Sequence, residues 1–211
     1  MAEPHQLLGL TAMAEGRLDE ASRSLARAME LQPASNATRS ALADLYGMLG
    51  RTRDETTQRE AVAALDANRP EALVSLALAH ARHGRPEAAV AALDRAGERF
   101  PGSEAVANAS GRIWLQRADA SGDPRAIRTA LEALAPAAAR ETASSETLSL
   151  YGRALLLNGD LIAARAALLR ATTQFPIARD VFLQLSQAEA RLGRRDAAKI
   201  ALAKHRALTT P

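Results

Sequence analysis

Few residues of this chain are spaced so that they could do chemistry. His80 and His83 lie three positions apart, a spacing at which two imidazoles on one helix can share a metal ion. No second pair of ligands completes such a site, so we expect both histidines to pack or to be hydrated. Carboxylate pairs such as Asp54 and Glu55 follow a turn and begin a helix, where negative charge is ordinary.

Several classes of site are excluded by what the sequence lacks. It has no cysteine, which excludes disulfide bonds, thiolate nucleophiles and cysteine-bound zinc. No serine lies in a G-x-S-x-G motif, and there is neither a P-loop nor a dinucleotide-binding glycine motif. We therefore expect no enzymatic activity, no cofactor and no metal. The 27 Lys and Arg residues are interspersed with 24 Asp and Glu residues, so nucleic-acid binding is not expected either.

The composition favours helix. Hydrophobic residues make up 47% of the 211 residues but aromatic residues only 3%, so alanine and leucine supply most of the apolar side chains. No apolar run reaches the ~18 residues that span a bilayer. The short apolar segment 7–14 follows no Lys or Arg, so we expect no signal peptide. The compartment stays open, with the cytoplasm as the default and the periplasm as the alternative for a piece of a longer envelope protein.

A repeat of 34 residues organises the chain. Turn glycines recur with this interval in three of four steps, and a small residue lies seven positions before each of them. The glycines are Gly16, Gly50, Gly84, Gly159 and Gly193. The small residues are Gly9, Ala43, Ala77, Gly152 and Ser186, and Gly111 extends their series. A glycine suits a tight turn between antiparallel helices, and a small residue lets the two helices cross closely.

The segment after each turn repeats a second pattern. An alanine comes five positions after the glycine, a leucine nine, an alanine twelve and a proline seventeen. In the first unit these are Ala21, Leu25, Ala28 and Pro33, and the third and fifth units repeat them. We expect the leucine to fill the groove between the helices and the proline to end the second helix.

These features resemble the tetratricopeptide repeat. The resemblance implies an all-α solenoid of about six helix–turn–helix repeats forming a right-handed superhelix, as one array over residues 1–211. The expected repeats span residues 2–35, 36–69, 70–103, 104–144 (with insertions), 145–178 and 179–211. Lysine occurs only at Lys199 and Lys204, and this preference for arginine is typical of a GC-rich bacterium.

Two units depart from the pattern. In the second, Glu55, Arg59 and Val62 replace the alanine, leucine and second alanine, so its second helix is unusually polar. The fourth unit carries seven extra residues, which we assign to a longer turn at 119–124 and a looser linker over 126–152, near 141–145. Whether this insertion is a plain surface loop or a hinge stays open.

The resemblance also implies that the first helix of each repeat lines a concave binding face. The positions expected on that face are Arg82, Asn108, Arg112, Gln116, Arg153, Gln187 and Arg191, with Asp44 and Ser149 beside them. The arginines form either an ordinary hydrated face or a groove for an acidic or carboxylate-bearing segment. No first helix contains lysine, so the lysine clamp of chaperone-binding members is not reproduced.

The expected function is a protein–protein interaction scaffold or adaptor that binds a protein or peptide in this groove. A bacterial envelope, secretion or polysaccharide-export assembly is the expected setting. The alternative is a structural array that self-associates through its uncapped ends, and a more distant one is an RNA-binding α-solenoid.

Overall fold

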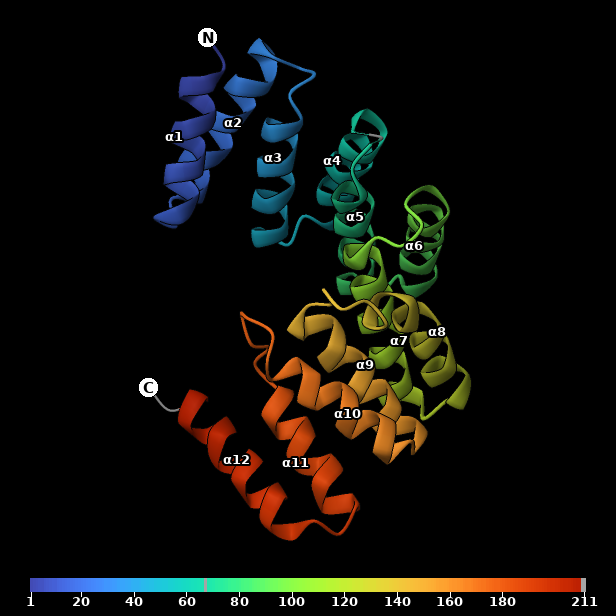
Figure 1. Ribbon diagram of the computed structural model, residues 1–211. Coiled ribbons are helices and arrows are strands. Elements are labelled where there is room, and N and C mark those ends of the chain that lie inside the picture. Colours follow the sequence, from blue (N-terminus) through green and yellow to red (C-terminus); the bar gives the residue numbers. More distant parts are fainter. Residues whose placement is uncertain (67, 210–211) are drawn as a thin grey trace. The chain divides into compact units, whose positions relative to one another are not determined.

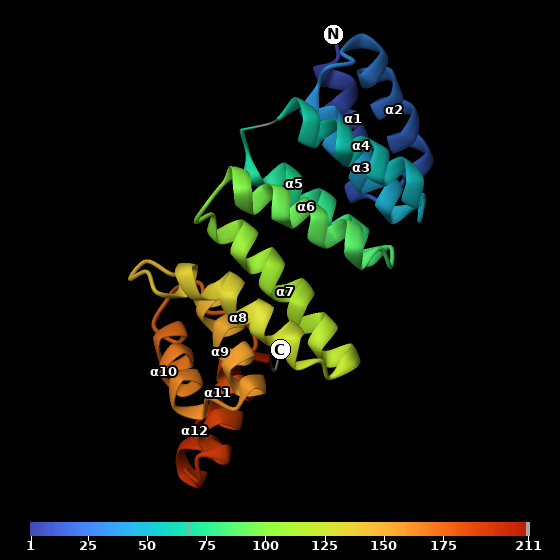
Figure 2. The same cartoon turned by 90° about the vertical axis from the view of Figure 1, so that its right-hand side faces the viewer.

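The computed structural model describes residues 1–66 and 68–209, and over these residues helices joined by turns and loops are its only regular secondary structure, without strands (Figure 1). The helices form antiparallel pairs, and Figure 2 shows α3 and α4 side by side. The bounds are α1 Glu3–Ala14, α2 Leu18–Leu31, α3 Asn36–Met48, α4 Thr52–Leu65, α5 Pro70–Arg82, α6 Pro86–Arg99, α7 Glu104–Ser121, α8 Pro124–Ala138, α9 Ser145–Asn158, α10 Leu161–Ala171, α11 Val181–Arg191 and α12 Arg195–Thr209. The chain is an all-α solenoid of helix–turn–helix pairs, as the sequence predicts.

The helix boundaries follow from local sequence. Ser35, Ser103 and Ser144 each precede a first helix, and each hydroxyl accepts a hydrogen bond from a backbone N–H of the first turn. At the other end of α9, Gly159 has φ +89°, a left-handed conformation that ends the helix and starts the turn. None of the described helices is both long enough and apolar enough to cross a membrane.

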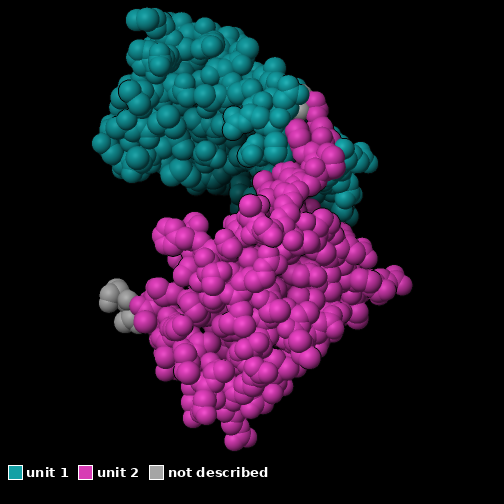
Figure 3. All heavy atoms as spheres, viewed as in Figure 1, with its two compact units in different colours: residues 1–98 teal, residues 99–211 magenta. Residues whose placement is uncertain are grey.

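The chain divides into two compact units, which are described separately below. Unit 1 spans Met1–Glu98 and unit 2 spans Arg99–Pro211 (Figure 3). In unit 1 a buried cluster joins α1, α2 and α3 around Leu25 and Leu45. In unit 2 the largest cluster joins α8 to α12 and includes Leu148, Leu168 and Phe182. Each cluster is built from the small and large residues that the repeat pattern places on facing helices.

The small residues lie where the helices cross. A Cβ atom added to Gly9 or Gly152 would lie 2.6 Å from Cγ of Leu25 or Leu168, the leucines of the same repeats. Ala21 is completely buried, as are its equivalents Ala89 and Ala164. The crossing therefore has no room for a larger side chain, which is the physical basis of the repeat pattern.

The fourth repeat differs from its prediction. Its crossing glycine, Gly111, packs on Leu134, 23 residues later, whereas the matching pairs in the first and fifth repeats are 16 residues apart. All seven extra residues therefore lie before Leu134. The buried alanine four positions before that leucine is Ala130, so Ala126 is not the crossing residue and the linker to α9 is not lengthened.

The predicted longer turn in this repeat is also wrong. α7 continues through Ser121, and only Gly122 and Asp123 separate it from α8. α7 and α8 have 18 and 15 residues, compared with 14 and 11 in α9 and α10. Seven residues make about two helical turns, so one added turn on each helix keeps the same faces in contact. α8 begins directly after Asp123, whose carboxylate accepts a hydrogen bond from the backbone N–H of Arg125 at 2.9 Å.

The segment between α8 and α9 is fastened to unit 2. Arg140 donates a hydrogen bond to the carbonyl of Gly102 at 2.5 Å, and the N–H of Ser144 donates to Glu104 at 3.0 Å. Burial alone would raise the pKa of Glu104, but hydrogen bonds from Ser144 and Thr147 outweigh it and leave the pKa below its ordinary value. The carboxylate therefore stays ionised and holds the linker.

Candidate functional site

Two of the three arginines expected on the inner face of unit 2 pair with carboxylates of neighbouring first helices. Arg112 of α7 donates to Glu146 of α9, and Arg153 of α9 donates to Asp119 of α7. The four side chains remain between 40% and 54% exposed. Ion pairs this exposed contribute only about 0–1 kcal/mol each, so they are easily exchanged for pairs with another molecule.

These two arginines lie on one hollow of about 440 Å³, called here the charged hollow. Its walls come from α7, α9, the start of α11 and the loop that precedes α11. The charged residues that line it are Arg112, Arg153 and Arg179 against Glu146 and Asp180. In the lining itself three guanidinium groups face two carboxylates, and the third carboxylate, that of Asp119, pairs with Arg153 from outside the lining.

The other inner-face residues of unit 2 make different contacts. Arg191 donates to a backbone carbonyl of α9 at 2.6 Å, and Asn108 accepts from a threonine hydroxyl of α9 at 2.8 Å. Ser149, which also lines the charged hollow, donates to a glutamine of α11 at 2.8 Å. Gln116 and Gln187 are exposed. The structure thus brings Arg112 and Arg153 together, while Arg191 and Asn108 fasten first helices to each other.

Arg82, the inner-face arginine of unit 1, belongs to a cluster that the sequence did not predict. It donates to Glu55 of α4, whose side chain is completely buried. Arg59 and His83 also bond this carboxylate, each at 2.8 Å. Glu55 occupies the place of the crossing alanine, and Gly47 on α3 makes room for it, since a Cβ there would lie 3.1 Å from Glu55 Oε2.

The charge of Glu55 is maintained by its partners. Burial alone would raise the pKa of this carboxyl group, but the hydrogen bonds from Arg59 and His83 outweigh it, so the pKa lies below its ordinary value. Arg59, in the place of the usual leucine, is only 12% exposed and also donates to Asp44 at 2.9 Å. A buried ionic network therefore replaces the apolar crossing of the second repeat.

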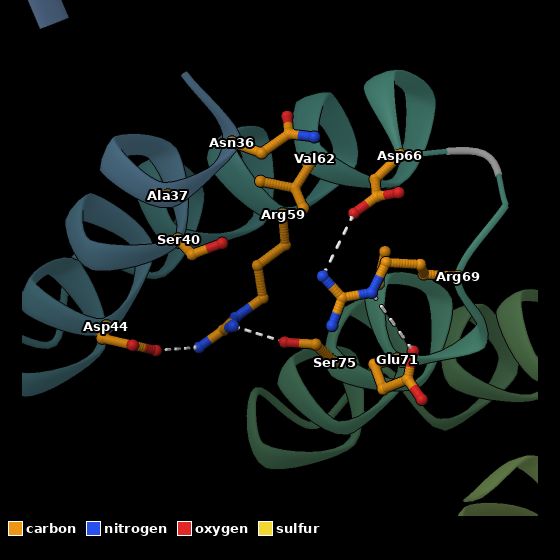
Figure 4. A pocket seen from close by; sticks show the side chains of 11 residues that line it. Asn36, Ala37, Ser40, Asp44, Arg59, Val62, Asp66, Arg69, Glu71 and Ser75 are labelled. Atoms are coloured by element: carbon orange, nitrogen blue, oxygen red, sulfur yellow. Dashed lines mark hydrogen bonds and ion pairs between the residues drawn. The ribbon is translucent and has the colours of Figure 1, made fainter.

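A second hollow, of about 500 Å³, lies beside this network in unit 1 (Figure 4). Arg59 reaches across it from α4, between Asp44 of α3 and Ser75 of α5 (Figure 4). At its rim Arg69 lies 3.7 Å from carboxylate oxygens of both Asp66 and Glu71. The charged groups that line this hollow are thus paired with one another.

The two histidines at metal-sharing spacing do not meet. His83 bonds Glu55, whereas His80 is buried and its Nδ1 has no hydrogen-bond partner. Burial lowers the pKa of His80, so the imidazole is favoured in its neutral form. Among the described residues no group of three or more His, Cys, Asp or Glu side chains could hold a metal ion.

Sequence reasoning missed the loop before α11. This loop lies between α10 and α11 and contributes Arg179 and Asp180 to the charged hollow. It also presents Phe175, whose side chain is 93% exposed. One signal in the sequence could have found it, because this linker reads Phe-Pro-Ile, with a large apolar residue on both sides of the proline, where the corresponding linkers read Gln-Pro-Ala and Phe-Pro-Gly.

Comparisons with known proteins agree with the repeat architecture. Two family models, each described as a tetratricopeptide repeat, match residues 2–35 and 70–113. A search of curated proteins gave no match. A chain of the Cut9–Hcn1 hetero-tetramer of the APC/C is 16% identical with a TM-score of 0.70; the match covers 99% of this chain but only 40% of that one.

Bacterial proteins of similar length share the fold. Pseudomonas aeruginosa pilF is 18% identical with a TM-score of 0.68, over 99% of this chain and 91% of that chain. A tetratricopeptide-repeat protein from Parabacteroides merdae is 14% identical with a TM-score of 0.72, over 100% and 80%. The family matches, the crossing residues and the shared fold lead to one conclusion: the chain is a tetratricopeptide-repeat protein.

Proposed function

We propose that this protein is an interaction scaffold that holds an acidic peptide segment of a partner protein on the first helices of unit 2. The repeat family supports a protein–protein interaction role in general. The charged hollow supports the finer proposal, because it gathers Arg112, Arg153 and Arg179 on one surface. Guanidinium groups bind carboxylates through two parallel hydrogen bonds, which makes arginine well suited to such a segment.

The pairing of these arginines is compatible with ligand binding. Glu146 and Asp119 occupy them in the free protein, and both carboxylates are 45% exposed. A peptide carboxylate that replaced them would release them into water, where their hydration offsets most of the lost attraction. The intramolecular pairs also restrain the arginine side chains, which reduces the entropy lost when a ligand binds.

The setting that we propose is a bacterial envelope, secretion or polysaccharide-export assembly. The fold is shared with pilF and with PilW, the latter described as a type IV pilus biogenesis factor. PilW is 16% identical with a TM-score of 0.71, over 98% of this chain and 92% of that chain. The acidic partner proposed above is independent of this setting.

A peptide selection tests the proposal. A library of random 12-residue peptides is displayed and selected on the intact protein, and the enriched peptides are expected to be rich in Asp and Glu. The best peptide is then titrated by fluorescence anisotropy into wild type and the Arg112→Ala, Arg153→Ala double variant at two salt concentrations. We expect an affinity at least about tenfold lower, equivalent to 1.4 kcal/mol, and a weaker salt dependence.

A matched control removes two arginines elsewhere. Arg125 and Arg128 are exposed on α8, a second helix that does not line the charged hollow. The Arg125→Ala, Arg128→Ala variant has the same net charge as the groove variant and should bind like wild type. Equal losses in both double variants, or no loss in the groove variant, would show that the peptide does not bind at the charged hollow.

A further inference from the structure

An apolar hollow lies next to the charged one in unit 2. Its volume is about 590 Å³, and Phe175 and Ile177 of the loop before α11 line it together with Leu208 of α12. The loop is orange and α12 is red in Figure 1. These side chains are 93%, 37% and 61% exposed. Large apolar groups gathered on one exposed surface are typical of sites where another protein binds.

The two hollows share a wall. Residues 176–179 line both, so the loop presents one surface to the charged hollow and another to the apolar hollow. The shared segment includes Arg179, which is exposed and lines both hollows. A ligand that enters one hollow is therefore in reach of the other.

We infer that the two hollows form one bipartite docking site for a peptide that carries an Asp or Glu close to a large apolar residue. The inference rests on the proposed function and names its second determinant, an apolar anchor. The carboxylate would bind among Arg112, Arg153 and Arg179, and the apolar side chain would cover Phe175 and Leu208. Charge complementarity selects this occupant, because Arg112, Arg153 and Arg179 line the charged hollow while Asp119, the partner of Arg153, lies outside that lining.

The sizes of the hollows set the spacing of the two determinants. Taken as spheres, volumes of about 440 and 590 Å³ have diameters of roughly 9 and 10 Å, so the centres of the two neighbouring hollows lie roughly 9–10 Å apart. An extended chain advances about 3.3–3.6 Å per residue. The acidic and the apolar residue should therefore be two or three positions apart in the peptide.

The peptide selection described above provides the probe, and what is measured is the spacing between acidic and apolar residues in the enriched peptides. Enriched peptides should carry Phe, Leu, Ile or Met two or three residues from Asp or Glu. The best peptide and a version with its apolar residue changed to Ser are titrated into wild type and into Phe175→Ser. Wild type should lose at least tenfold affinity for the Ser peptide, and Phe175→Ser should bind both peptides with similarly reduced affinity.

Controls separate the anchor from a general loss of apolar surface. Ile162 on α10 is 79% exposed and lines neither hollow, so Ile162→Ser should bind both peptides like wild type. Phe175 is almost fully exposed, so its replacement should leave the helical circular dichroism and the Trp114 fluorescence unchanged. The molar mass by light scattering, with and without peptide, shows whether a second copy of the chain covers the apolar hollow.

The outcomes distinguish the inference from the proposed function. If Arg112→Ala, Arg153→Ala weakens the peptide while Phe175→Ser does not, the acidic-peptide proposal stands and the apolar anchor is refuted. If neither variant weakens it, both are refuted. If Phe175→Ser instead abolishes a concentration-dependent dimer and has no effect on peptide binding, the apolar hollow is a contact between copies and the bipartite site is refuted.

Discussion

The ionic crossing of the second repeat can be tested by replacing Glu55. The Glu55→Ala variant places at this position the alanine that other repeats carry, but the three partners of the Glu55 carboxylate remain. Arg59 and His83 each lose a hydrogen bond of 2.8 Å, and Arg82 loses its ion pair. The variant therefore restores the sequence pattern while it breaks the contacts.

The size of the effect follows from burial. Removing one partner from a buried ion pair destabilises a protein by about 3–5 kcal/mol, because the other charge is left uncompensated. Arg59 is 12% exposed but keeps Asp44 at 2.9 Å, and Arg82 is 55% exposed and can be hydrated. We therefore expect the lower end of that range, about 3 kcal/mol, and a loss confined to unit 1.

A second substitution should reverse most of this loss. Glu55→Ala together with Arg59→Leu recreates the alanine and leucine of the apolar crossings, and a buried ion pair exchanged for apolar residues of similar volume is often neutral or stabilising. Urea unfolding followed by circular dichroism gives the free energy of unfolding of wild type, both single variants and the double variant. Trp114, the only tryptophan, lies in unit 2, and its fluorescence reports on that unit.

The double-mutant cycle measures the energetic coupling between Glu55 and Arg59. A double variant whose loss equals the sum of the two single losses would show that Glu55 and Arg59 are energetically independent, contrary to the structure. The pH dependence gives a second criterion. Because the folded-state pKa of Glu55 is below its ordinary value of 4.5, its contribution is full above pH 4.5 and is lost as the pH falls through the folded-state pKa. That acid-side loss should be absent from the double variant.

Two further predictions concern packing and a buried imidazole. Gly152→Ala should lower the free energy of unfolding by about 1–3 kcal/mol, because its Cβ would lie 2.6 Å from Leu168. Gly97→Ala has no atom within 4 Å of the added Cβ, so it should instead stabilise α6 by up to about 1 kcal/mol. Urea unfolding measures both variants, and equal effects would contradict the crossing geometry. His80 has a folded-state pKa below 6.5, so its neutral form stabilises the fold above pH 6.5 and this advantage is lost as the pH falls. His80→Leu should therefore lose less stability than wild type between pH 7.5 and 5.5, and parallel pH profiles would rule this out.

Much of the fold was predictable because the signals are local. A turn needs Gly159 for its left-handed backbone, and a helix crossing needs Gly152 opposite Leu168. Such requirements recur at fixed spacing, so the period, the helix pairs and the buried positions can be read from one chain. The position of Arg112 and Arg153 on neighbouring first helices follows from the same spacing.

The fourth repeat shows where this reasoning fails. Asp119, Ser121 and Gly122 have the composition of a loop, and that composition predicts a longer turn. α7 nevertheless runs through Ser121, because extending both helices by about one turn keeps Gly111 against Leu134. The packing of the helices outweighed the local preference of two polar residues, and it placed Asp119 beside Arg153.

The sequence by itself determined the repeat, the helix pairs and the exclusion of cysteine-based sites, since these depend on residue types and on short spacings along the chain. Only the tertiary structure decided which charges meet. Glu55 and His83 are 28 positions apart, and Arg153 and Asp119 are 34 apart, so no local pattern links them. The loop before α11 likewise becomes part of a candidate site only because folding places Phe175 near Leu208 and Arg179 near Arg112. A pairing between distant side chains depends on how the helices stack. The stacking is the result of many contacts together, and no single residue of the sequence indicates it.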